Sequence, residues 1–143
     1  MQAFNIYHNV FIQADSADLF KAISEPKYLV NWWPLRCSGK CELNEEYNLF
    51  FTEEYDWLAK IEELRIDHFI QFKMIKSDPD WDSTFFRFEL IVQENGTLLE
   101  FSHCNWPKNN HHFRRSSYCW AILLKGLKDY LEQGSIVPFE KRG

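Results

Sequence analysis

The order of hydrophobic periodicities constrains the fold more than any other feature of the sequence. Between residues 47 and 104 apolar residues recur with the period of two that is typical of strands, whereas over residues 113–132 they recur at spacings of three and four. The second stretch predicts one long amphipathic helix, which must cover the apolar face of the sheet because no other long element is available. We therefore expect an α+β fold, with a curved antiparallel sheet of five or six strands wrapped around a long C-terminal helix.

Six segments are predicted to be strands. Residues 6–12 show the alternation of a first strand. The other candidates follow one another at 47–51, 57–66, 68–75, 84–93 and 97–104. Turn-forming residues separate them, and Asn95-Gly96 is a tight hairpin signal because both residues tolerate positive φ. We expect consecutive strands to pair as a meander, with the register of the strand after Trp33 left open.

Two short helices are expected after the first strand. Asp15 and Ser16 are suitable N-cap residues for a helix that ends at Ser24. Pro26 suits the first position of a second helix, which carries a tryptophan pair at residues 32–33 and ends at Pro34.

The composition fits one soluble domain spanning residues 1–143. The chain has 16 Lys and Arg against 21 Asp and Glu, a net charge of −5 that argues against nucleic acid as a partner. Its longest apolar run, residues 118–124, is far shorter than the roughly 18 residues that a membrane span needs. The N-terminal residues show no signal-peptide pattern, so we expect a cytoplasmic protein with no membrane span.

No disulfide, metal site or cofactor is expected. The four cysteines, Cys37, Cys41, Cys104 and Cys119, contain no Cys-x-x-Cys pair and are interpreted as free thiols. A metal site built on Cys37 and Cys41 would lack two further ligands nearby.

One acidic loop resembles a calcium site in its spacing alone. Asp78, Asp80 and Asp82, followed by Glu89, match the carboxylate positions of a calcium-binding loop. Ser83 stands where that loop requires glycine, and the flanking segments are predicted strands, not helices. We interpret the loop as a solvated hairpin connection.

One basic cluster precedes and begins the long helix. Its members are Lys108, His111, His112, Arg114 and Arg115. They could bind an anion at the helix N-terminus, where the dipole helps. A solvated helix end that balances the acidic surface is the favoured interpretation.

Aromatic residues make up 17% of the chain, with 13 Phe, 6 Trp and 6 Tyr. Strand alternation and the helical stripe direct many of them into the space between sheet and helix. The candidate lining residues are Phe72, Met74, Phe86, Phe88, Phe101 and His103 on the strands, and Phe113, Ser117, Trp120 and Leu124 on the helix. Rings of this size either fill such a space or wall a cavity, and both alternatives stay open.

Several segments resemble one family. The stretch SEPKYLVNWW at residues 24–33 is similar to the short-helix signature with a tryptophan pair found in the family named after the activator of the heat-shock chaperone ATPase. TLLEFSH at 97–103, then Trp106 and Trp120, and LKDYLEQG at 127–134 look like its closing strand and helix. The chain departs from that pattern at 35–51, where it has only Gly39 and the family is usually glycine-rich.

The resemblance implies the helix-grip fold of the START/SRPBCC superfamily. It implies a hydrophobic cavity between the long helix and the sheet, with Trp33 and Trp106 at its ends. Members include a cochaperone domain that binds the heat-shock chaperone, carriers of lipids or small hydrophobic molecules, and, among wider relatives, cyclases and other enzymes. The resemblance therefore implies a pocket more firmly than a reaction.

His103 is the weak catalytic candidate of the sequence. Alternation with Phe101 directs it inward, where a neutral imidazole could bind a ligand or act as a base. The favoured interpretation is a core histidine that bonds to backbone or to a partner such as Ser117.

The function that these observations favour is non-catalytic binding of a small hydrophobic ligand in the cavity. One alternative is a chaperone protein as partner, contacted through the surface. A second alternative is a cyclase-like or hydrolytic enzyme that uses the cavity, with His103 as its base.

Overall fold

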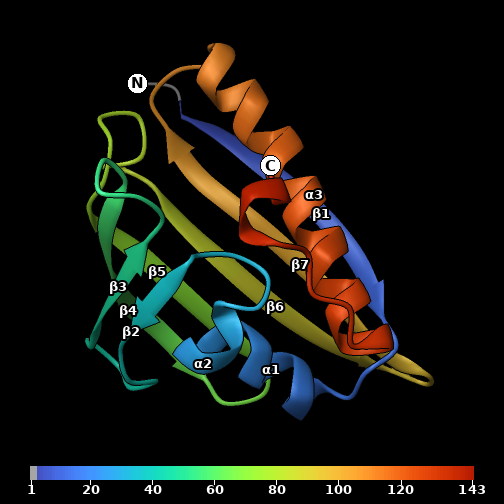
Figure 1. The fold of residues 1–143 in the computed structure, drawn as a ribbon. Helices are drawn as coiled ribbons and strands as arrows, with labels where there is room; N and C mark the ends of the chain where they lie inside the picture. The colour runs from blue at the N-terminus through green and yellow to red at the C-terminus, as the bar shows by residue number, and fades with distance from the viewer. Residues whose placement is uncertain (1–2) are drawn as a thin grey trace.

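The computed structural model describes residues 3–143 (Figure 1). In chain order its elements are β1 (Phe4–Ile12), α1 (Ser16–Ser24), α2 (Pro26–Leu29), β2 (Arg36–Ser38), β3 (Glu46–Phe50), β4 (Asp56–Arg65), β5 (Phe69–Lys76), β6 (Phe85–Gln93), β7 (Gly96–Trp106), α3 (His111–Gln133) and the short 3₁₀ helix η1 (Phe139–Lys141). This order confirms the expected succession of strand, short helices, antiparallel strands and long helix.

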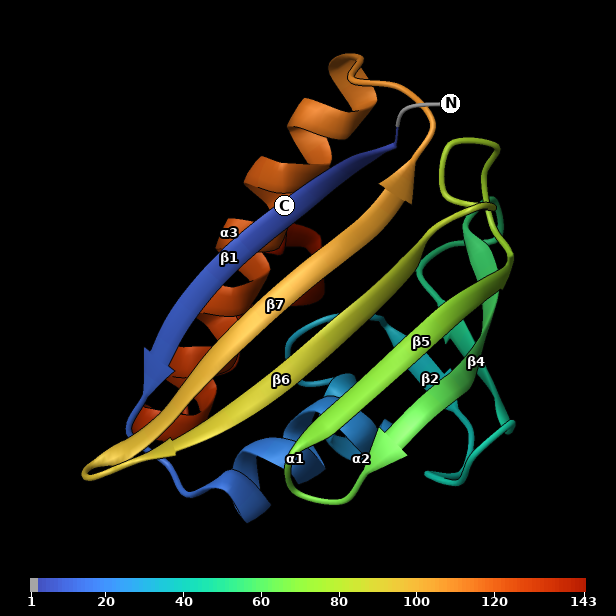
Figure 2. The ribbon, with the colours of Figure 1, turned by 180° about the vertical axis from the view of Figure 1, so that it is seen from behind.

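All the strands of residues 3–143 form one antiparallel sheet of seven, in the order β1-β7-β6-β5-β4-β3-β2. Strands β2 to β7 pair with their neighbours in sequence, and β1 pairs with β7. Figures 1 and 2 show a strongly curved sheet with the three α-helices on one face, where α3 lies along β1. This is the expected helix-grip fold.

The region after Trp33 differs from the prediction. Arg36–Ser38 form an additional edge strand, β2, in which Cys37 pairs with Leu49 of β3. A strand of three residues is too short for a period of two to appear in the sequence. Helix α2 ends at Leu29, so the tryptophan pair follows the helix in a turn, where the amide of Trp33 still donates to the carbonyl of Leu29 at 2.9 Å.

Helix α3 begins earlier than its hydrophobic stripe predicts, at His111 instead of Phe113. Asn110 is the N-cap, and its Oδ1 accepts a hydrogen bond from the amide of Phe113 at 3.0 Å. Polar residues in a first turn give no hydrophobic signal, which explains the difference. Gly134 is the expected C-cap, with a φ of 72°. In the described range 3–143, the helices lack the combination of length and apolar composition that crossing a bilayer demands.

Aromatic rings fill the space between α3 and the middle of the sheet. The ring of Trp120 lies 4.3 Å from Phe101 and 5.9 Å from Phe86, centroid to centroid, and Phe88 lies 5.1 Å from Phe101. All four side chains are fully buried. Interiors packed in this way leave no room for a ligand, so the open volume of this fold lies elsewhere.

Candidate functional site

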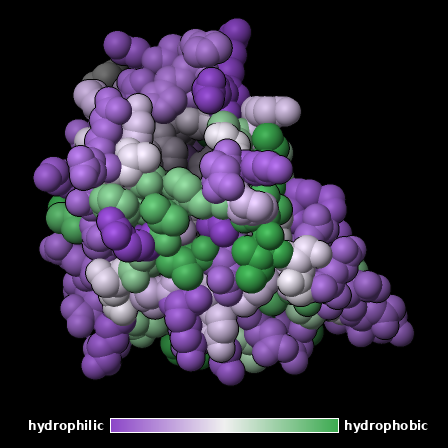
Figure 3. All heavy atoms as spheres, viewed as in Figure 1, coloured by the Kyte–Doolittle hydropathy of each residue, from purple (hydrophilic) through white to green (hydrophobic). Residues whose placement is uncertain are grey.

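An open pocket of about 510 Å³ lies beside the first half of α3. It is bounded by that helix, the β3–β4 turn, the β5–β6 loop and residues 139–143, which run back along α3 (Figure 1). Figure 3 shows a hollow in the upper half of this face, with hydrophobic atoms beside it. A volume in this range is typical of sites for small molecules.

Aromatic side chains are the most numerous class in the pocket wall. They come from separate segments of the chain and are Trp33, Phe51, Tyr55, Trp57, Trp81, Trp120 and Phe139. Ring centroids lie 5.0 Å apart for Trp33 and Trp120, and 4.6 Å apart for Trp57 and Trp81. Among the described residues, Leu123 is the one branched aliphatic side chain in the wall. The pocket wall is therefore mainly aromatic.

One buried histidine connects two of these tryptophans. The indole N–H of Trp120 donates to Nδ1 of His103 at 3.0 Å, and Nε2 of His103 lies 2.8 Å from the Thr84 hydroxyl. That hydroxyl donates to the carbonyl of Trp81 at 2.7 Å. Because an indole only donates and the hydroxyl proton is used on Trp81, the imidazole must accept at Nδ1 and donate at Nε2. His103 is therefore held as one neutral tautomer.

The surroundings of His103 keep it neutral. The ring is fully buried, and burial, together with the nearby charge of His112, lowers the pKa of His103 from 6.5 to about 3. Both ring nitrogens are occupied by protein partners. This geometry suits a residue that positions Trp120 and Trp81 better than one that takes a proton from a ligand in the pocket.

Acidic side chains of the β5–β6 loop hold that loop in shape. Oδ1 of Asp78 accepts hydrogen bonds from the amides of Asp80 and Trp81, at 3.0 and 3.2 Å. Asp80 accepts from Nδ1 of His112 at 2.9 Å, and that hydrogen bond lowers the pKa of the Asp80 carboxyl. Oδ1 of Asp82 accepts from the amide of Ser77 at 2.9 Å. These carboxylates fix the position of Trp81 and join the loop to the start of α3.

The tail is fastened over the pocket by Arg142. Its Nη1 donates to the carbonyl of Val30 at 2.8 Å, and its Nε donates to the carbonyl of Val137 at 2.8 Å. Val30 follows α2, where helix carbonyls lack partners within the helix. Phe139 and Glu140 are thereby held at the rim of the pocket.

The predicted lining residues divide between the pocket and the interior. Trp33 and Trp120 line the pocket. The residues that instead pack in the buried core are Phe72, Met74, Phe86, Phe88, Phe101, His103, Trp106 and Leu124. Periodicity placed all of them except Trp106 on inward faces, and the resemblance placed Trp106 at an end of the cavity. Inward positions near the middle of the sheet meet other rings and not open space.

Two predicted helix residues face the other way. Phe113 packs against Trp106 at 5.4 Å between centroids. The carbonyl of Ser117 lies 3.0 Å from Nε2 of His8 on β1, so Ser117 is not the partner of His103. Ser116 lines the pocket in its place. Consecutive residues of a helix point about 100° apart, so a small error in the predicted orientation of the apolar stripe selects Ser117 where Ser116 faces the pocket.

Sequence reasoning missed most of the pocket wall. Phe51, Tyr55 and Trp57 flank one turn, and Trp81 occupies the acidic loop, where its ring packs against Trp57 at an interplanar angle of 43°. The concentration of rings around a turn at residues 51–57 was the available signal, because turns seldom need large apolar side chains. Arg115 of the basic cluster also lines the pocket.

The cysteines and acidic residues of the described part of the chain do not gather into a set of metal ligands. No cluster of three His, Cys, Asp or Glu side chains suited to a metal occurs within residues 3–143. Cys37, Cys41, Cys104 and Cys119 are free thiols. Burial raises the pKa of Cys37 from 9.0 to about 12, which keeps this thiol protonated and unreactive.

The chain matches one protein family and many solved structures. The family described as activator of Hsp90 ATPase homolog 1-like protein matches residues 13–132. The solution structure of the Aha1 dimer from Colwellia psychrerythraea is 26% identical, with a TM-score of 0.85 over 92% of this chain and 98% of that one. No curated protein sequence matches.

Two further structures resemble this chain in fold. A protein of Staphylococcus saprophyticus is 18% identical, with a TM-score of 0.80 over 94% of this chain and 96% of its own. A protein of Mesorhizobium loti is 14% identical, with a TM-score of 0.82 over 93% of this chain and all of its own. The match over residues 13–132 covers most of the sequence, so this chain belongs to the family of activator of Hsp90 ATPase homolog 1-like proteins.

Proposed function

We propose that this domain binds a small hydrophobic molecule in the pocket beside α3 and does not catalyse a reaction on it. The observation that carries the proposal is the wall of seven aromatic residues around about 510 Å³ of open space. Apolar concave sites of this size bury most of the surface of a small ligand.

The surroundings of His103 support binding over catalysis. Its hydrogen bonds go to Thr84 and Trp120, and no carboxylate is among its partners in the part of the chain described. A general base needs access to the substrate proton, and this ring is fully buried. The cyclase-like or hydrolytic alternative receives no support from this arrangement.

Filling the pocket tests the proposal. Cys119 lines the pocket on α3, so Cys119→Trp introduces an indole into the ligand space. Tyr118→Trp is the matched control, because Tyr118 is 69% exposed and lies outside the pocket wall. At a hundredfold excess of an apolar probe over its Kd, binding adds about 2.7 kcal/mol and raises the Tm by roughly 5–10 °C.

We expect that shift for the wild-type protein and for Tyr118→Trp, and we expect its loss for Cys119→Trp. Unchanged melting of the wild-type protein across a library of apolar compounds would contradict ligand binding. An equal shift in Cys119→Trp would place the binding outside this pocket.

A second candidate function is activation of a chaperone ATPase through the protein surface. The family description and the similarity to the Aha1 protein from Colwellia psychrerythraea favour it. The ATPase rate of an Hsp90 chaperone, measured with and without this protein, tests it. A surface mechanism predicts equal stimulation by the wild-type protein and Cys119→Trp, whereas no stimulation by either would remove it.

A further inference from the structure

The character of the pocket wall discriminates between classes of hydrophobic ligand. Seven rings and the single branched aliphatic Leu123 face the space among the described residues. A carrier of acyl chains needs a long aliphatic lining, whereas stacked and edge-to-face contacts favour flat ring systems. The tryptophans already interact in this way, since Trp81 is stacked with Trp120 at 6.3 Å and an interplanar angle of 21°.

Most of the charged side chains around the pocket already interact with other groups of the protein. Asp78 accepts hydrogen bonds from two backbone amides of its own loop. His112 donates to Asp80. Arg142 is bound to backbone carbonyls, and Glu140 lies close enough to stabilise its charge.

The Glu140 carboxylate has no hydrogen bond or ion pair among the described residues, but it lies near Arg142. Arg115 is the lining cation without such a partner. No hydrogen bond or ion pair within residues 3–143 engages its guanidinium, although it lines the pocket. The first turn of α3 carries no acidic residue, so nothing in that turn neutralises Arg115. The helix dipole adds positive potential at the same end.

A buried donor in the wall also lacks an acceptor. The indole Nε1 of Trp81 has no hydrogen-bond partner among the described residues, and the side chain is only 7% exposed. Buried polar groups without partners are costly and rare. Trp81 is also a residue of the pocket wall, so this unpaired donor belongs to a side chain that an occupant would contact.

From these observations we propose that the pocket takes a flat aromatic compound that carries an anionic group such as a carboxylate or sulfonate. The rings lie against the tryptophans, and the anion faces Arg115. This inference rests on the proposed ligand-binding function and names the ligand class for the same pocket.

Two fluorescent probes that differ by one charge test the inference. 1-Anilinonaphthalene-8-sulfonate and N-phenyl-1-naphthylamine share a ring system, and only the first carries a sulfonate. We expect the wild-type protein to bind both with 1:1 stoichiometry, and the sulfonate about tenfold more tightly, the typical effect of one charge-assisted hydrogen bond. The preference should shrink as salt is added.

Variants of the protein test whether Arg115 causes the preference for the sulfonate probe. Arg115→Gln is expected to abolish the preference, because it should weaken binding of the sulfonate probe far more than binding of the neutral probe. Arg114→Gln is the control, because Arg114 bonds to Asn109 and lies outside the pocket wall; it should retain the full preference. Cys119→Trp should abolish the binding of both probes, and this loss would place their binding site in this pocket.

The outcomes separate the two proposals. If neither probe binds, ligand binding itself fails. If both bind equally well, or Arg115→Gln keeps the preference, the anionic group is wrong while ligand binding stands. Dodecanoate has the charge without the rings, so displacement of the sulfonate probe by dodecanoate at equal concentration would overturn the aromatic class.

Discussion

Replacing His103 with leucine should have two separable effects on stability. The substitution places an apolar side chain of similar size in the core but removes both hydrogen bonds of the imidazole. Trp120 then loses the acceptor of its indole N–H, and Thr84 loses the donor at its hydroxyl oxygen. A buried group left without a partner costs about 1–3 kcal/mol, so we expect the free energy of unfolding to fall by about 2–4 kcal/mol at pH 7.

The second effect is a change in the pH dependence of stability. The pKa of His103 is about 3 in the folded protein and 6.5 ordinarily, so below pH 6.5 the unfolded chain binds a proton that the folded protein excludes. The free energy of unfolding therefore falls as the pH is lowered, with a slope that approaches about 1.36 kcal/mol per unit below pH 6.5, and loses about 2 kcal/mol between pH 7 and 5. Asp80 and Glu132, whose pKa values are lowered, lose their contributions only below about pH 4.5.

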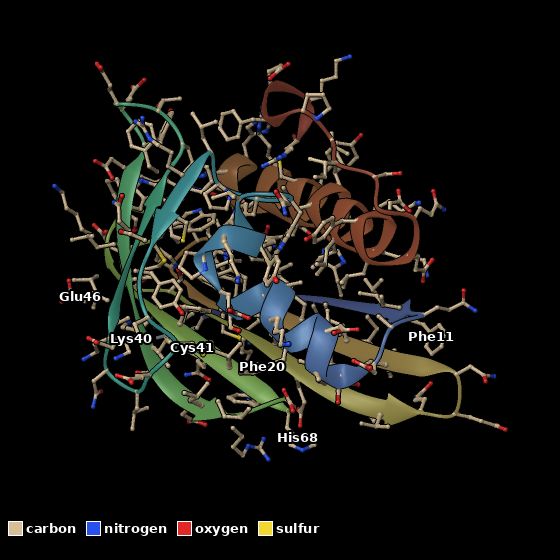
Figure 4. The ribbon with its side chains drawn as sticks, turned by 60° about the horizontal axis from the view of Figure 1, so that its bottom comes forward. Phe11, Phe20, Lys40, Cys41, Glu46 and His68 are labelled. Carbon is tan, nitrogen blue, oxygen red and sulfur yellow. The ribbon has the colours of Figure 1, made fainter. Side chains whose placement is uncertain are left out.

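Urea denaturation at pH 7, 6 and 5 measures both effects. The wild-type protein should lose stability across this range, and His103→Leu should be less stable at pH 7 but lack this contribution to the pH dependence. His68→Leu is the matched control, because His68 is exposed on the turn between β4 and β5 (Figure 4). If His103→Leu retained the wild-type slope, or cost no stability at pH 7, the assignment of His103 as a neutral buried link would be refuted.

Two further pairs of substitutions test the backbone at the sheet edge and the attachment of the tail over the pocket. Gly39→Ala should lower the free energy of unfolding by more than about 1–2 kcal/mol in urea denaturation, because φ is 152° and a Cβ would lie only 2.5 Å from the ring of Tyr47. Gly126→Ala, in α3 with open space around it, should instead add about 0.5–1 kcal/mol, and a similar loss at both positions would contradict this reasoning. Arg142→Gln should speed hydrogen exchange of residues 139–143 by releasing the tail, whereas the exposed neighbour Lys141→Gln should not; equal exchange in both variants would show that Arg142 does not fasten the tail.

The fold could be predicted because long periodic segments carry their own signal. The stripe of α3 and the alternation of β5 to β7 identified a sheet covered by one helix. The expected hairpin does join β6 to β7, but its turn residues are Glu94 and Asn95, and Gly96 already pairs with Gln93 as the first residue of β7. Strand β2 was missed because it has three residues, and its pairing with β3 is a tertiary contact that local sequence does not encode. Helix α2 was predicted too long because its last turn continues with helix-like backbone bonds up to Trp33.

The pocket was harder to predict than the fold because it depends on segments that meet only after folding. Alternation correctly identified Phe86 and Phe101 as inward, but it cannot tell a filled interior from an open one. Trp57 of β4 and Trp81 of the β5–β6 loop pack against each other, and the hydrogen bond from the Trp81 amide to Asp78 sets this contact. A titratable residue on an inward face, His103, was recognised, but its partners could not be read from spacing.

The indole N–H signals of the six tryptophans test the central claim most directly. A ¹H–¹⁵N spectrum distinguishes them during titration with N-phenyl-1-naphthylamine. Four line the pocket, namely Trp33, Trp57, Trp81 and Trp120, and two lie outside its wall, namely Trp32 and Trp106. The account predicts saturable shifts of the first four signals and much smaller shifts of the last two; no shifts, or equal shifts of all six, would contradict a ligand site in this pocket.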